Sequence, residues 1–114
     1  MSATMKNFRN AALAALVSVL ATGPALAANP AAGQEIAKGV CQACHGVDGN
    51  SQNADFPKIG GQHPDYLAKA LRDYQSGARN NPIMKGMAGA LKAEDVDNVA
   101  AWYGSQAQVL GVKH

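Results

Sequence analysis

Segment 40–49, VCQACHGVDG, contains two cysteines three positions apart, and a histidine directly follows the second: Cys41, Cys44 and His45. Three kinds of chemistry use such a cluster. The thiols can form a redox-active dithiol, or all three side chains can contribute to a zinc site. Alternatively, the thiols can bind the two vinyl groups of a haem as thioethers while the histidine ligates the iron. Each of these sites requires different partners in the rest of the chain.

The rest of the chain argues against zinc and against a dithiol enzyme. A closed structural zinc site needs four ligands, and the only other histidines are His63 and His114, with no further cysteine. A thiol–disulfide oxidoreductase places its cysteines at the start of a helix within a βαβ pattern, whereas this motif ends a predicted helix and no segment alternates like a strand. Haem attachment is therefore the favoured prediction, and thiol–disulfide exchange remains the weaker alternative.

A haem that carries electrons usually has a second axial ligand, which is a methionine or a histidine from a distant segment. Beyond the N-terminal region the only methionines are Met84 and Met87. Most methionines only fill apolar space, but these two lie three apart in a segment flanked by glycine and proline. We predict that one of them is the ligand, and their spacing does not choose between them. His63 is a weaker candidate because it precedes a proline at a predicted helix start. If neither methionine binds, the iron site is open to small gases or peroxide.

The N-terminal residues 1–27 have the order of a secretory signal peptide. Lys6 and Arg9 precede an apolar run, and the segment ends in the small-residue pattern Ala25-Leu26-Ala27. The apolar run is too short for a membrane span. We expect residues 28–114 to form one mature domain in the periplasm, with no membrane span. Removing Lys6 and Arg9 from the ten basic residues leaves eight, against eight acidic ones, so no nucleic-acid-binding charge remains.

The mature chain is predicted to be all-α. Helices are expected over 29–45, 63–77 and 92–105, with loops over 46–62 and 78–90. Asn29 and Pro30 are a typical helix start, and Gly77 is a typical stop. The second helix has an apolar face of Leu67, Ala70, Leu71 and Tyr74, and the third has one of Val96, Val99, Ala100 and Tyr103. Candidates to line the pocket are Ile59, Leu67, Leu71, Ile83, Leu91 and Val99.

With these residues in hand, the chain resembles a class I c-type cytochrome, and in particular one half of the dihaem periplasmic cytochromes. The resemblance covers roughly residues 30–107. Its carrying segments are CQACHGVDGN, FPKIGGQHPDYLAKALRDYQSG, RNNPIMKGMAGAL and EDVDNVAAWY. It implies a small cytochrome c fold in which three main helices and loops wrap one covalently bound haem.

The resemblance also implies roles for single residues. Cys41 and Cys44 would hold haem c, with His45 and Met84 as axial ligands of the iron and Met87 as the second choice. The carbonyl of Pro57 would accept a hydrogen bond from the ring of His45. The first and last helices would cross near Gly33, with Tyr103 or Trp102 against it. Lys92 departs from the usual Ser or Thr at a helix N-cap, at a local cost of about 1 kcal/mol.

The implied function is one-electron transfer in the periplasm by an electron carrier that is not an enzyme. The carrier would act alone or as the cytochrome subunit of a redox enzyme. Its partners would be redox proteins that dock transiently at the haem edge, and the protein itself would be a monomer. The lysines Lys38, Lys58, Lys69 and Lys85 could surround that edge, although a solvated surface is the favoured interpretation.

Overall fold

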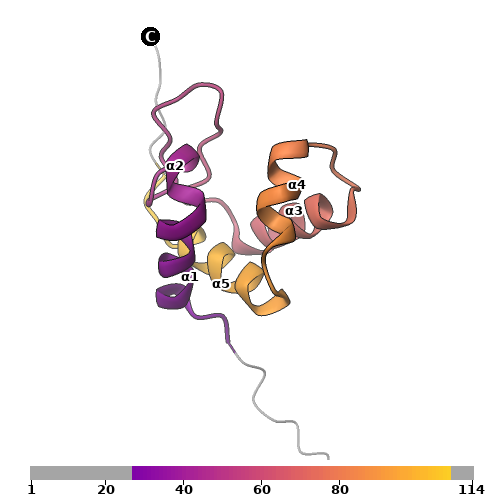
Figure 1. The fold of residues 1–114 in the computed structure, drawn as a ribbon. Helices are drawn as coiled ribbons and strands as arrows, with labels where there is room; N and C mark the ends of the chain where they lie inside the picture. The colour runs from indigo at the N-terminus through magenta and orange to yellow at the C-terminus, as the bar shows by residue number, and fades with distance from the viewer. Residues whose placement is uncertain (1–26, 109–114) are drawn as a thin grey trace, which may run out of the picture.

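The computed structural model describes residues 27–108, and all regular structure in that range is helical (Figure 1). The elements are α1 (Pro30–Ile36), the π-helical segment η1 (Ala37–Cys41), α2 (Gln42–His45), α3 (Pro64–Ser76), α4 (Pro82–Gly89) and α5 (Ala93–Gly104). The predicted all-α class is confirmed. Within residues 27–108 no helix has the length and apolar character needed to cross a membrane. The predicted signal peptide and His114 lie outside the described residues, apart from Ala27.

The elements α1, η1 and α2 follow one another without a break and form one continuous helical column over residues 30–45. Asn29 caps its start, because the side-chain oxygen accepts hydrogen bonds from the backbone N–H groups of Ala31 (3.0 Å) and Ala32 (3.2 Å). Both the start and the end agree with the sequence prediction. The π-helical turn was not predicted. It ends at Cys41, the first cysteine of the motif. A π-helical turn contains one residue more than an α-helical turn, and this wider turn lies directly before the rest of the motif.

The close crossing of α1 and α5 depends on Gly33. A Cβ atom built at this glycine would lie only 1.9 Å from the carbonyl oxygen of Asn98. The Asn98 side chain also accepts a hydrogen bond from the backbone N–H of Asn29, at 2.8 Å. The expected crossing at Gly33 is confirmed, but the expected aromatic partner is wrong. The contact is backbone against backbone, which leaves no space for a ring, and Tyr103 lies further along α5.

The core lies where α5 meets the first column and α3. Its fully buried members include Ala37, Val96 and Tyr103, each at most 1% exposed. The predicted buried face of α5 is confirmed. The predicted face of α3 divides between two tasks, since Leu67 joins the core while Tyr74 lines a cavity.

Segment 78–90 was predicted to be a loop, and this prediction is wrong because residues 82–89 form α4. The side-chain oxygen of Asn81 accepts hydrogen bonds from the N–H groups of Ile83 (3.1 Å) and Met84 (3.0 Å), and Pro82 takes the first helical position. This is the same Asn-Pro start that defines α1. The glycines inside the helix made a loop the expected structure, but each glycine costs a helix only about 1 kcal/mol relative to alanine.

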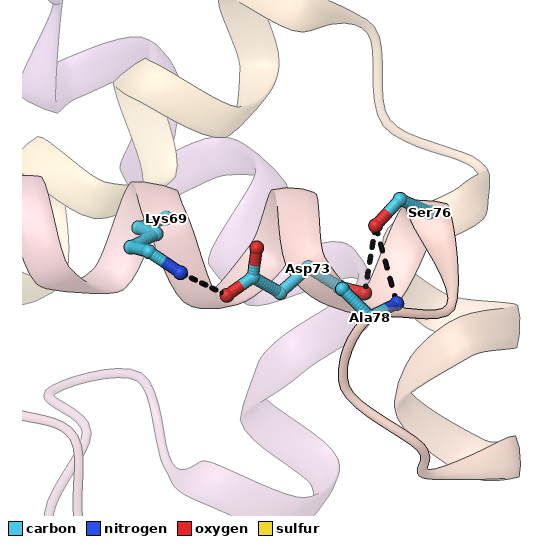
Figure 2. A network of polar contacts seen from close by, with 4 residues as sticks. All are labelled: Lys69, Asp73, Ser76 and Ala78. Carbon is cyan, nitrogen blue, oxygen red and sulfur yellow. Dashed lines mark hydrogen bonds and ion pairs between the residues drawn. The ribbon is translucent and has the colours of Figure 1, made fainter.

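The turn that ends α3 is held by its own polar side chains (Figure 2). The hydroxyl of Ser76 donates to the carbonyl of Asp73 and accepts from the N–H of Ala78, each at 3.2 Å. Lys69 forms an ion pair with Asp73 one turn earlier. Gly77 takes the left-handed conformation (φ 82°) and ends the helix as predicted. The chain therefore leaves α3 in a defined direction toward α4.

The N-cap residue of α5 is Lys92, whose side chain cannot cap the helix, and Asp95 compensates for part of this loss. Its carboxylate accepts a hydrogen bond from the backbone N–H of Lys92, at 2.9 Å. The lysine side chain has no acceptor to offer the helix in return, so only half of a capping box can form. This moderates the loss of stability expected from Lys92.

We predict that Gly33→Ala destabilises the holo-protein by about 2 kcal/mol or more, because the new methyl group must displace backbone. Gly39→Ala is the matched control, since nothing lies within 4 Å of its built Cβ. Alanine there should leave stability unchanged or raise it by up to about 1 kcal/mol. Chemical denaturation followed by circular dichroism measures both. Equal midpoints for the two variants would contradict the role given to Gly33.

Candidate cofactor site

A cavity of about 380 Å³ lies between the helical column, α3, α4, α5 and the loop before α3. Its wall is mainly apolar and includes Ile59, Leu67, Leu71, Ile83 and Val99, as predicted. Leu91 was also predicted to line it, but this side chain packs against the core cluster instead. Three groups that can bind iron or haem carbon face the cavity: the two cysteines, His45, and the methionines of α4.

The His45 ring is buried and is held from behind by the loop. Its Nδ1 atom lies 2.9 Å from the carbonyl oxygen of Pro57. Because a carbonyl can only accept, Nδ1 must carry the proton and donate it. In the neutral ring this leaves Nε2 with a free lone pair, which is the form that ligates a metal. The hydrogen bond that the resemblance implied is therefore present, and it selects the ligating tautomer.

The two cysteines are half-buried free thiols that both line the cavity. Burial raises the pKa of the Cys41 thiol above its usual value, and a hydrogen bond with Tyr103 opposes this only in part. Cys41 is thus protonated at neutral pH. A thiol–disulfide enzyme needs the opposite shift, toward a reactive thiolate. The environment of Cys41 therefore disfavours that alternative.

Two aromatic side chains at the end of α5 hold the chain directly after His45. The indole N–H of Trp102 donates to the carbonyl of Val47 at 2.7 Å, and the hydroxyl of Tyr103 donates to the carbonyl of Gly46 at 3.0 Å. Burial is also the main reason that the pKa of Tyr103 is raised, so its hydroxyl stays a donor at all ordinary pH values. This role of Trp102 and Tyr103 was not predicted from the sequence. The available signal was two adjacent aromatic residues, each with a polar tip, at the end of the last helix.

The same end of α5 also fixes the loop that supplies Pro57. The N–H of Gly61 donates to the carbonyl of Tyr103 at 2.9 Å, and the N–H of Ile59 donates to the carbonyl of Gly49 at 2.8 Å. Gly49 has φ 76°, and its built Cβ would lie 2.5 Å from the backbone nitrogen of Gly60. The loop therefore closes on itself and on α5, which sets the position of the carbonyl that orients His45.

Both methionines face the cavity from α4. Met84 is half-buried, whereas Met87 is 45% exposed. This difference favours Met84 as the side chain directed at the centre of the cavity. His63, the weaker candidate, is exposed at the N-cap position of α3 and is not among the lining residues.

The four predicted lysines differ in their surroundings, and Lys85 is exposed on α4. Lys38 and Lys69 are exposed and form ion pairs with Glu35 and Asp73 on their own helices. Lys58 lines the cavity. Surface ion pairs of this kind contribute little energy, so Lys38 and Lys69 are best described as solvated surface.

The donor set fits a covalently bound haem. Two thiols at a spacing of three stand beside an imidazole with a free Nε2, and a neutral thioether shares the cavity from another element. Among residues 27–108 no three acidic, cysteine or histidine side chains converge as a metal-ion site. The chemistry of these donors suits haem iron, for which one histidine and one methionine are sufficient.

Comparison with known proteins points the same way. Residues 30–106 match the model of the cytochrome c family. A cytochrome c4 of Pseudomonas aeruginosa is 39% identical over 97 residues, which make up 85% of this chain and 48% of that protein. A thiosulfate dehydrogenase electron acceptor of Stutzerimonas stutzeri is 45% identical over 75 residues, 65% of this chain and 32% of that protein.

A solved structure is also similar. The crystal structure of reduced recombinant cytochrome c4 from Pseudomonas stutzeri matches with a TM-score of 0.65 and 31% identity, covering 68% of this chain and 48% of that one. The chain thus spans about half the length of the cytochrome c4 relatives that it matches.

We predict that Tyr103→Phe lowers the free energy of unfolding of the holo-protein by about 1–2 kcal/mol, because the carbonyl of Gly46 loses its donor while ring packing is kept. The control is Tyr74→Phe, whose ring also faces the cavity but whose hydroxyl has no hydrogen bond described within residues 27–108. It should stay within about 0.5 kcal/mol of the wild type. Equal effects in the same denaturation assay would show that the hydroxyl bond is unimportant.

Proposed function

This chain belongs to the cytochrome c family, and on that premise we propose that Cys41 and Cys44 bind its haem c and that His45 and Met84 ligate the iron. Its cofactor is one haem c, and its role is electron transfer rather than catalysis. Met87 is the second choice for the distal ligand.

The observation that carries the proposal is the 2.9 Å hydrogen bond from His45 Nδ1 to the Pro57 carbonyl. It uses Nδ1 as the donor and so leaves Nε2 as the ring atom available for the iron, in a cavity that Met84 also lines. Histidines that ligate a metal usually donate their other ring N–H to a backbone carbonyl or carboxylate in this way.

The bound haem supplies a one-electron iron couple. The protein supplies the surroundings that tune it. The hydrogen bond from His45 strengthens the imidazole as a donor. The neutral thioether of Met84 favours ferrous over ferric iron, and the apolar wall of the cavity does the same by keeping water out. If His45 and Met84 ligate the iron in both oxidation states, little of the protein would have to move when an electron is gained or lost.

We further propose that residues 1–27 are removed on export and that residues 28–114 work as a single domain in the periplasm. Covalent haem attachment in bacteria takes place outside the cytoplasm, and the thiols must reach that compartment reduced. Intact-mass measurement of the protein from a periplasmic extract should give residues 28–114 plus one haem. An uncleaved chain with haem would overturn the cleavage site alone, and a haem-free chain from a host that matures other c-type cytochromes would overturn the haem assignment.

The partners are redox proteins, and we propose that they dock transiently on a monomer at the exposed edge of the haem. One relative is named as the electron acceptor of thiosulfate dehydrogenase. This favours a second candidate role for the present chain, as the acceptor unit of a dehydrogenase. Gentle purification from the native host separates the two roles. A stable stoichiometric partner supports the subunit, and a lone protein that exchanges electrons with added donors supports the free carrier.

We predict that Met84→Ala abolishes the weak far-red iron–sulfur absorption band of the oxidised protein, because alanine cannot ligate. Met87→Ala should keep the band, since that side chain is 45% exposed and Met84 is the more buried of the two. The reverse result would make Met87 the ligand.

The open-iron alternative is tested on the wild type. If both axial positions are filled, carbon monoxide should not change the spectrum of the ferrous protein at neutral pH. Rapid binding of carbon monoxide to the untreated protein would instead favour gas or peroxide chemistry.

A further inference from the structure

The helix that carries both methionines is tied down by one side chain of α3. The Nε2 atom of Gln75 donates hydrogen bonds to the carbonyl oxygens of Ala88 (2.9 Å) and Leu91 (3.1 Å). An amide NH₂ group has two hydrogens, so this geometry uses its full donor capacity. Gln75 itself is half-buried and does not line the cavity.

Both carbonyls lie at the C-terminal end of α4. Ala88 lies in the last turn of the helix, where its carbonyl also accepts the N–H of Leu91 at 3.0 Å, and Leu91 lies just beyond the helix end. Ala88 is also the one buried residue of α4, at 1% exposure. Gln75 therefore binds the C-terminal end of α4 to α3 through two hydrogen bonds.

On its own, α4 is a weak element. It has eight residues, two of which are glycines with open space around them, and isolated helices of this length are unstable in water. Its N-terminal end is capped by Asn81 from its own segment, which orders the first turn but does not attach it to the rest of the molecule. Its packing and hydrogen bonds to α3 therefore help to fix where α4 and its methionines lie.

We propose that Gln75 is a positioning residue that holds α4 over the cavity and so keeps the methionine ligand on the haem iron. The proposal rests on the proposed function, in which a methionine of α4 is the distal ligand, and it holds for Met84 or Met87 alike. Ferric iron binds a thioether less favourably than ferrous iron does. In the ferric state the ligand is therefore retained largely because its helix is preorganised.

The test is a titration of the ferric holo-protein with imidazole, which must displace the methionine in order to bind. The loss of the far-red band reports that displacement. Gln75→Leu removes both hydrogen bonds, and Gln75→Glu keeps the length of the side chain but removes the donor. We expect either variant to bind imidazole about five- to twentyfold more tightly than the wild type, given the usual size of two such bonds.

Two further variants separate positioning from general stability. Gln106→Leu removes a comparable amide–carbonyl bond, from Gln106 to Trp102 at 3.2 Å, and a second bond to the Ser105 hydroxyl, at a position just beyond the end of α5. It should lower stability without changing imidazole affinity. Gln75→Lys restores a donor that can reach both carbonyls, and it should return the affinity to within about threefold of the wild type. It also provides a folded variant if Gln75→Leu fails to mature.

The outcomes are distinct. Unchanged imidazole affinity in both donor-less variants, with the far-red band lost in Met84→Ala or Met87→Ala, would overturn the role of Gln75 and leave the proposed function intact. If Gln106→Leu raised the imidazole affinity as much as the Gln75 variants do, the role of Gln75 would also be overturned and the proposed function would stand. A far-red band that survives in both methionine variants would overturn methionine ligation and the role of Gln75 together.

Discussion

The backbone contact between α1 and α5 at Gly33 sets the position of every group on the histidine side of the cavity. It brings α5 close enough for the Asn98 side chain to bond the N–H of Asn29, and for Val96 and Tyr103 to be fully buried. From there the polar tips of Trp102 and Tyr103 reach the two carbonyls that follow His45. The close crossing of α1 and α5, which lie at opposite ends of the described chain, thus helps to orient the imidazole ring of His45.

The two sides of the cavity are supported in different ways. The histidine side belongs to the core and is fixed by α5 and by a loop that closes on itself. The methionine side is formed by α4, a short helix with one buried residue, which packs on α3 and accepts hydrogen bonds from Gln75. This asymmetry matches the ligand strengths that the proposed coordination implies. Imidazole bonds iron firmly in both oxidation states, whereas a thioether is the weaker donor to ferric iron. The side with the weaker ligand is therefore the one whose affinity a small structural change can adjust.

Sequence reasoning recovered the parts that depend on local rules. The Asn29–Pro30 start, the Gly77 stop and the buried face of α5 were predicted from capping and periodicity, and the structure confirms them. The same Asn-Pro signal at Asn81 was overlooked because glycines in the following segment favoured a loop. The partner of Gly33 was wrongly expected to be aromatic, since sequence shows that a glycine permits a close approach but not what approaches. The side chains of Trp102, Tyr103 and Gln75 donate hydrogen bonds to backbone carbonyls. Every residue has such a carbonyl, so the sequence does not indicate which one accepts the bond.

The most direct test of the account is proton–carbon NMR of the reduced holo-protein with methionine methyl groups labelled by carbon-13. Residues 28–114 contain two methionines, so two methyl signals are expected. The account predicts that one lies far upfield, because a ligating methyl group sits over the face of the porphyrin ring, while the other stays near its ordinary position. Met87→Leu should remove only the ordinary signal. Two ordinary signals in the wild type would contradict the central claim that a methionine of α4 completes the coordination begun by His45.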